Sequence, residues 1–127
     1  MTPIPSVPYT FRAAPIRTID GDSIVCRLDF RAFRYGDLAL RLLGVDTPEV
    51  VGATAEAGKA AKQFTADWLT RATLGDLKWP LVLETTLDRN DKYGRLLARV
   101  WRVNDGQELN QALLDGGHAA AYSGGTR

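Results

Sequence analysis

Two β-strands joined by a tight turn are predicted from residues 10–30, TFRAAPIRTIDGDSIVCRLDF. The runs 10–19 and 23–30 are rich in β-branched and apolar residues, and in the second run apolar side chains recur at every second position. Asp20-Gly21 lies between the runs and is typical of a hairpin turn, because glycine there readily adopts a positive φ. These two strands begin an antiparallel sheet.

Three further strands are predicted downstream, over residues 38–45, 79–87 and 95–103. The first follows a predicted turn at Gly36-Asp37. In the last strand, the period of two places Leu96, Ala98 and Val100 on one face and Arg95 with Arg99 on the other. The basic face is therefore expected to point away from the core.

Two amphipathic helices are predicted, over residues 55–74 and 107–115. Gly75 ends the first, and Gly116-Gly117 offers the second a left-handed cap. The aromatic side chains expected to fill the core are Phe64, Trp68 and Trp101. We therefore expect an α+β, mainly β fold: a five-stranded OB-fold barrel with two packed helices.

The chain of 127 residues is 45% hydrophobic, which favours one compact domain. We expect a flexible N-terminal arm over 1–8, the domain over 9–122 and a C-terminal tail over 123–127. No apolar run is long enough to span a bilayer and no signal peptide is visible, so membrane insertion is not expected. Localisation stays open, and the cytoplasm is expected only if the N-terminus is complete.

Cys26 is the only cysteine and His118 the only histidine. These counts exclude an internal disulfide, a zinc site built from several thiolates and a histidine-rich metal site. Cys26 is expected to be buried and inert, and His118 to be a packing or surface residue. Any catalysis must therefore use carboxylates and arginines. The net charge of +1 does not by itself indicate a nucleic-acid binder.

Charged residues nevertheless gather by sign. A basic patch is predicted from Arg89, Lys92, Arg95, Arg99 and Arg102, whereas acids gather at Asp20 with Asp22 and at Asp46 with Glu49. Carboxylate oxygens suit a calcium-like cation, and the planar guanidinium of Arg41 suits two phosphate oxygens. Juxtaposed, these groups could hold a metal beside a phosphate.

Each motif also has a purely structural interpretation. The Asp22 segment can be a hairpin turn, and VDTPE at 45–49 can start a helix, with proline at its first position. Arg41 can form a salt bridge at the rim, and DKYGR at 91–95 can form a hairpin with Gly94 left-handed. Tyr122 can belong to a fraying tail rather than to a base-stacking site.

Taken together and in order, IDGDSI at 19–24, RLLGVDTPE at 41–49 and NDKYGR at 90–95 resemble the staphylococcal nuclease (thermonuclease-like) family. This resemblance implies an OB-type barrel and a hydrolase of phosphodiester bonds. It further implies a calcium-dependent, sugar-nonspecific endonuclease that acts on DNA and RNA and leaves 3′-phosphate ends. Single-stranded or locally open nucleic acid is the expected substrate, and a monomer the expected form.

The resemblance also implies roles for individual residues. Asp22 and Asp46 would bind Ca²⁺ through their carboxylates, and Thr47 through its backbone carbonyl. Glu49 would hold the attacking water, while Arg41 and Arg95 would grip the phosphate and stabilise the transition state. The residues expected to contact the substrate are Lys92, Tyr93 and Tyr122.

One departure from the family pattern is the hairpin over residues 29–38, which is longer than in the family's best-known member. It is predicted to project further and could extend the binding groove. Two other functions stay open beside the nuclease. One is a non-catalytic OB-fold module that binds nucleic acid or protein, and the other is a structural component with a vestigial site.

Overall fold

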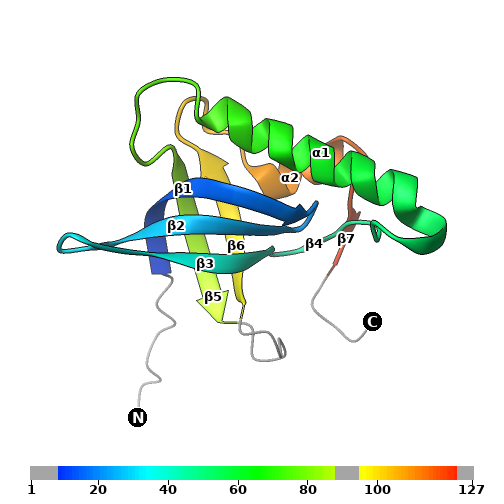
Figure 1. Cartoon of the computed structure of the whole chain (residues 1–127), viewed down its shortest axis with the longest axis horizontal. Coiled ribbons are helices and arrows are strands. Elements are labelled where there is room, and N and C mark those ends of the chain that lie inside the picture. The colour runs from blue at the N-terminus through cyan, green and yellow to red at the C-terminus, as the bar shows by residue number, and fades with distance from the viewer. Residues whose placement is uncertain (1–8, 88–94, 123–127) are drawn as a thin grey trace, which may run out of the picture.

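The computed structural model describes residues 9–87 and 95–122, and its centre is a closed five-stranded barrel of order β1-β2-β3-β6-β5 (Figure 1). The strands are β1 (Tyr9–Asp20), β2 (Ser23–Arg31), β3 (Arg34–Leu42), β5 (Leu81–Leu87) and β6 (Leu96–Arg102). The long β1 pairs antiparallel with both β2 and β5, which closes the barrel on one side. On the other side β3 pairs with β6 in parallel. The predicted mainly β barrel is confirmed.

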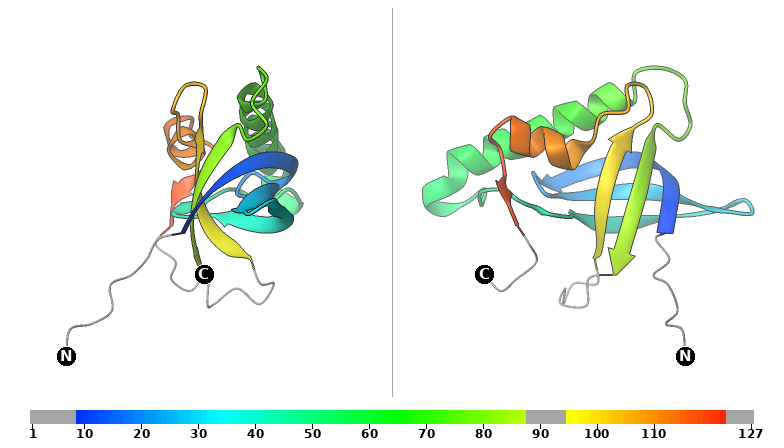
Figure 2. Two further views of the ribbon diagram at one scale, coloured as in Figure 1. Left: turned by 90° about the vertical axis from the view of Figure 1, so that its left-hand side faces the viewer. Right: turned by 180° about the vertical axis from the view of Figure 1, so that it is seen from behind.

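Two helices pack against the barrel, as the sequence predicts. After a 3₁₀ turn (η1, Gly52–Thr54), α1 (Ala55–Ala72) crosses the barrel, and α2 (Leu109–Asp115) contacts both α1 and β6 (Figure 2). At the end of α2, His118 N–H donates to Leu113 O and Gly117 N–H to Leu114 O. Gly117 has φ +73°, so this end is a Schellman cap. No helix in the described part of the chain is long and apolar enough to cross a membrane.

The hydrophobic core is built from alternate residues of the barrel strands and from one side of α1. Trp68 belongs to it and Phe64 packs at its edge, as expected. Trp101 does not: it is half-buried on the outer face of β6, where the guanidinium carbon of Arg99 lies 4.9 Å from its ring centre. Cys26 is fully buried, which confirms its predicted burial, and this desolvation raises the pKa of its thiol to about 12, as expected of an inert thiol.

The predicted turn after β1 is present, but the reason for its glycine differs. Gly21 is not among the glycines with positive φ. A Cβ at this position would lie 2.9 Å from side-chain atoms of both Ala61 and Thr47, so Gly21 lets α1 and the loop after β4 approach the turn. The glycine is needed for close packing rather than for backbone conformation.

The predicted turn at Gly36-Asp37 is wrong, because both residues lie inside β3. Gly36 pairs with Leu28, and a Cβ on it would lie 2.8 Å from the ring of Phe30. This glycine therefore makes room for an aromatic side chain. The chain reverses instead at Arg31, Ala32 and Phe33, which all have positive φ.

The segment VDTPE does not start a helix. Val45 and Asp46 form β4, a two-residue strand that pairs with β7 (Ala120–Ala121). Helical structure begins only at Gly52. The β4–β7 pairing instead brings the C-terminal segment beside residues 45 and 46.

Parts of the predicted organisation lie outside the described residues. These are the arm over 1–8, the tail over 123–127 and most of the predicted DKYGR hairpin. The division of the chain into arm, domain and tail therefore stays a prediction.

The backbone at the tip of the β2–β3 hairpin leads to a stability prediction. Ala32 has φ +53°, a conformation that costs a residue with a Cβ about 1–2 kcal/mol. Glycine lacks this cost but loses about 0.5–1 kcal/mol in unfolded-chain entropy. We expect Ala32→Gly to raise the free energy of unfolding by about 0.5–1 kcal/mol, measured by urea denaturation.

The matched control is Ala39→Gly, within β3, where the backbone is not left-handed. This variant should lower the free energy of unfolding. Destabilisation by both substitutions would show that the hairpin tip carries no such strain.

Candidate functional site

Arg41 lies at the centre of a charged cluster on the outer side of the barrel. Its neighbours in β3, Leu40 and Leu42, are buried in the core, so the alternation of the strand directs Arg41 outward. Nη1 of Arg41 lies 2.9 Å from Oδ2 of Asp22, and Nη2 lies 3.7 Å from Oδ1 of Asp46. Only 12% of the side-chain surface of Arg41 is exposed. The guanidinium is thus held between two carboxylates with little access for water.

Asp22 is also tied to the segment that carries the other predicted metal ligands. The backbone N–H of Thr47 donates to Oδ2 of Asp22 at 3.2 Å, and the N–H of Leu42 donates to the Asp22 carbonyl at 2.9 Å. Asp22 and Thr47 are both buried. The structure therefore brings Asp22, Asp46 and Thr47 to one place, although they come from the β1–β2 turn and from β4 with its following loop.

The donor chemistry of this cluster fits a hard cation. Carboxylate and carbonyl oxygens are the ligands that Ca²⁺ prefers. No group of three or more His, Cys, Asp or Glu side chains is placed to hold a metal ion within residues 9–87 and 95–122. A site here would thus use the two carboxylates, the Thr47 carbonyl and water.

Arg41 is also the group of this cluster that suits an anion. Its Nη1 is buried and lies 2.9 Å from Oδ2 of Asp22 in an ion pair, although the two groups are not aligned as a hydrogen bond. A phosphate oxygen is the acceptor that a guanidinium suits best.

Arg95 lies beside Arg41 because of strand register. Its Nη1 donates to Oγ of Ser23 at 3.0 Å, and Ser23 pairs with Arg41 across β2 and β3. Arg41 also pairs with Leu97 across β3 and β6, two residues after Arg95. The two predicted phosphate-binding arginines therefore both lie next to Ser23.

The backbone of Glu49 is held from two sides. The Thr54 hydroxyl donates to the Glu49 carbonyl at 2.9 Å. Gly58 of α1 lies directly against the same carbonyl, so closely that a Cβ on Gly58 would overlap it. Glu49 is thus fixed near Thr47 by contacts with the start of α1.

Tyr122 reaches the cluster from the C-terminal segment. Its backbone N–H donates to Gly44 O at 2.9 Å, and the guanidinium carbon of Arg41 lies 5.6 Å from its ring centre. This distance allows a cation–π interaction. The structure thus favours a place at the site over a fraying tail. Lys92 and Tyr93, the other two predicted substrate contacts, lie outside the described residues.

The predicted basic patch is wrong at Arg102, which is buried, and is weakened at Arg99, which points outward as predicted but is paired with an acid. Arg99 forms an ion pair with Glu108, with 2.6 Å between Nε and Oε2. Arg102 is buried and donates to Asp105, to Gln107 and to the carbonyl of Trp68. Both arginines serve the structure, and Arg95 is the described member of the patch that lies at the site. Arg89 lies, like Lys92, outside the described residues.

Three residues that support the site were missed by the sequence analysis. Ser23 orients Arg95, Gly58 makes room for the Glu49 backbone, and Asn110 bonds the carbonyls of Leu43 and Ala98 at the end of β3. A lone Gly58 inside a predicted helix was the one visible indication of such a role, since glycine there costs about 1 kcal/mol relative to alanine.

His118 is confirmed as a packing residue, with its ring 4.7 Å from that of Phe64.

Comparisons with known proteins identify relatives of this chain. A family model described as "Staphylococcal nuclease homologue" matches residues 39–126. A thermonuclease of Staphylococcus intermedius is 41% identical over 88 residues, which cover 67% of this chain and 45% of that protein. A thermonuclease of Staphylococcus hyicus is 37% identical over 110 residues, 84% of this chain and 56% of that protein. The chain thus spans about half the length of the curated relatives it matches.

A more distant match is an uncharacterized protein of Methanocaldococcus jannaschii. It is 28% identical over 129 aligned positions, which cover 84% of this chain and 57% of that protein.

The contact between Gly58 and Glu49 predicts an unusual effect of alanine in a helix. Glycine to alanine inside a helix normally stabilises by about 1 kcal/mol. Here the new methyl group would overlap the Glu49 carbonyl and lie 2.7 Å from Val50 N. We expect Gly58→Ala to lower the free energy of unfolding by about 1–3 kcal/mol in chemical denaturation. Lys59→Ala, an exposed neighbour in α1, serves as the control and should have little effect. A stabilised Gly58→Ala protein would contradict the role given to this glycine.

Proposed function

The chain belongs to the Staphylococcal nuclease homologue family, and we propose that it is a calcium-dependent nuclease. It hydrolyses phosphodiester bonds of DNA and RNA and leaves 3′-phosphate ends. The observation that carries this proposal is the position of Arg41, between Asp22 and Asp46 and next to Arg95. Cation-binding and phosphate-binding groups share one small, largely buried region.

Arg41 and Arg95 bind the phosphate of the scissile bond. Their guanidinium groups present donors in a planar fork that suits two phosphate oxygens at once. Negative charge grows on these oxygens as the five-coordinate transition state forms, so the two arginines bind that state more tightly than the substrate. Ser23 limits the freedom of Arg95 through its hydrogen bond, which lowers the entropy lost on binding.

The residues that would hold calcium are Asp22, Asp46 and Thr47, the last through its carbonyl. A bound calcium ion would polarise the phosphorus centre and neutralise part of the developing charge. Thr47 and Asp22 are already joined by a hydrogen bond, so these ligands need little rearrangement.

Glu49 holds the attacking water and accepts its proton. The water oxygen bonds to phosphorus, the bond from phosphorus to O5′ breaks, and O5′ takes up a proton, which leaves the phosphate on the 3′ side. The support for this role is the fixed backbone of Glu49 two residues after Thr47.

Lys92, Tyr93 and Tyr122 contact the neighbouring nucleotide. The support for Tyr122 is its ring, whose centre lies 5.6 Å from the guanidinium carbon of Arg41.

The experiment that tests this function measures release of acid-soluble nucleotides from denatured DNA by the purified protein. We expect release with calcium, no release with a chelator, and strong loss of turnover in Glu49→Gln. Glu49→Gln should still bind calcium and a nucleoside bisphosphate, each enhancing the other, because it keeps the ligands and the arginines. Absence of release by a folded protein at micromolar concentration would favour the non-catalytic binding module instead.

Arg95 provides a second prediction. Arg95→Ala removes one donor to the transition state and should lower kcat/KM by at least about 100- to 1,000-fold, or about 2.7–4 kcal/mol. Arg99→Ala is the matched control, because Arg99 lies four residues after Arg95, on the outer face of β6, and is paired with Glu108. Initial rates on denatured DNA compare the two variants. Nearly equal rates for Arg95→Ala and wild type would refute the role of Arg95.

A further inference from the structure

The hairpin between β2 and β3 extends well beyond the barrel, at the end opposite to β4 and β7 (Figure 1). Its aromatic side chains are exposed: Phe33 at 105%, Tyr35 at 60% and Phe30 at 42%. A fully exposed phenylalanine at a hairpin tip adds nothing to the core. An exposed aromatic cluster of this kind is typical of a surface that contacts another molecule.

The backbone keeps Phe33 exposed at an energetic cost. Arg31, Ala32 and Phe33 have φ of 70°, 53° and 65°, three consecutive left-handed residues with side chains. Each such residue is strained, and strain of this kind is concentrated at ligand-binding and switch segments. Arg31 pairs with Arg34, so Ala32 and Phe33 form a two-residue turn that needs positive φ, and the chain places a phenylalanine there where glycine or asparagine is usual.

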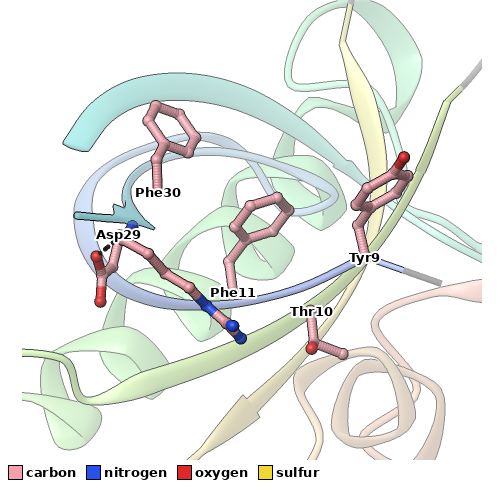
Figure 3. A pocket seen from close by; sticks show the side chains of 6 residues that line it. Tyr9, Thr10, Phe11, Asp29 and Phe30 are labelled. Atoms are coloured by element: carbon pink, nitrogen blue, oxygen red, sulfur yellow. Dashed lines mark hydrogen bonds between the residues drawn. The ribbon is translucent and has the colours of Figure 1, made fainter. Parts of the chain in front are cut away.

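A pocket of about 260 Å³ opens between the start of β1 and the end of β2 (Figure 3). It is lined by Tyr9, Thr10, Phe11, Asp29, Phe30 and Arg31. The rings of Phe11 and Phe30 meet edge to face with 6.0 Å between their centres. The pocket thus offers aromatic surfaces next to a guanidinium.

The charges of the hairpin leave a positive excess. Arg12 pairs with Asp29 at 2.7 Å and Arg27 pairs with Asp37 at 2.8 Å, so both carboxylates are neutralised. Hydrogen bonds from Arg31 N–H and Arg12 lower the pKa of Asp29, and one from Arg27 lowers that of Asp37, which keeps both pairs ionised near neutral pH. Arg31 and Arg34 form no salt bridge within the described residues. Two cationic groups therefore flank Phe33.

We propose that this hairpin surface, formed by Tyr9, Phe30, Arg31, Phe33 and Arg34, is a second binding site for single-stranded nucleic acid. Bases stack on the exposed rings, and the two arginines contact the backbone phosphates. Exposed aromatics interleaved with cations are the common solution for binding single strands, because every base has a face that can stack. The inference rests on the proposed function, since the strand bound here is the substrate of the nuclease.

Strand geometry places this second site far from the phosphate cluster. β2 runs from Ser23, which holds Arg95, to Arg31 at the hairpin tip. At about 3.3 Å per residue, these two ends lie about 26 Å apart along the strand. A dinucleotide cannot reach both sites. One OB fold covers about 4–16 nucleotides, so a strand of about 20 nucleotides is long enough to contact both sites at once. The hairpin surface should thus matter only for long substrates.

The test measures binding of a fluorescent oligothymidylate of about 20 nucleotides by anisotropy, with a chelator present to prevent cleavage. Phe33→Ala should weaken binding by about 5- to 150-fold, the range expected for one stacked base. Phe33→Tyr keeps an aromatic face and should bind like wild type. Arg34→Ala should lower the slope of log affinity against log salt by about 0.7, as for one lost phosphate contact.

Leu74→Ala is the matched control, because Leu74 is 71% exposed and lies after α1, away from the hairpin. It should not change binding, and melting temperatures confirm that all variants are folded. Unchanged affinity in Phe33→Ala overturns the inference, and a protein would then be the candidate partner of this surface.

Cleavage of a thymidine dinucleotide should be equal in Phe33→Ala and wild type. If wild type cleaves no substrate but its binding depends on Phe33, the nuclease proposal fails and the second site stands.

Discussion

The short parallel pairing of β3 with β6 is the constraint on which the barrel and the site depend. Among the described residues, Leu40, Arg41 and Leu42 are the ones of β3 that pair with β6, so this seam has the fewest paired residues in the closed barrel. Asn110 of α2 reinforces it: its side chain donates to Leu43 O and Ala98 O and accepts from Val100 N–H, all at 2.8–3.1 Å. A buried amide whose bonds all go to backbone fixes the position of α2 as firmly as that of the strands.

This seam decides which charged residues meet. Because β3 lies between β2 and β6, Arg41 has Ser23 on one side and Leu97 on the other, and Arg95 arrives two residues before Leu97. Beyond the seam, the chain leaves β3 through Gly44, which has φ +79°, and brings Asp46 and Thr47 back to Asp22. The site is thus a product of strand register, and its parts lie far apart in the sequence.

The periodicity of apolar residues was enough to predict the barrel strands, the two helices and the outward direction of Arg99 in β6. The structural role of a residue could not be predicted in this way where it depends on contacts with residues far away in the sequence. Gly21 and Gly36 both resembled turn residues, yet one makes room for Ala61 and Thr47 and the other for the ring of Phe30. VDTPE has the local chemistry of a helix start, but pairing of β4 with the C-terminal β7 overrides it. From the sequence, Arg102 looks like a surface cation, but in the structure it is buried and hydrogen-bonded to Asp105 and Gln107.

The burial of Arg102 couples parts of the molecule that share no strand pairing. Its guanidinium lies 4.5 Å from the ring centre of Trp68 and donates to the Trp68 carbonyl, while the indole N–H of Trp68 donates to Gln107 at 2.6 Å. If α1 separated from β6, Arg102 would lose its hydrogen bond to the Trp68 carbonyl and its contact with the Trp68 ring, and Gln107 would lose the bond from the indole N–H. These contacts tie α1, β6 and the turn before α2 to one another, which is the arrangement expected of a single cooperative unit with one free energy of opening.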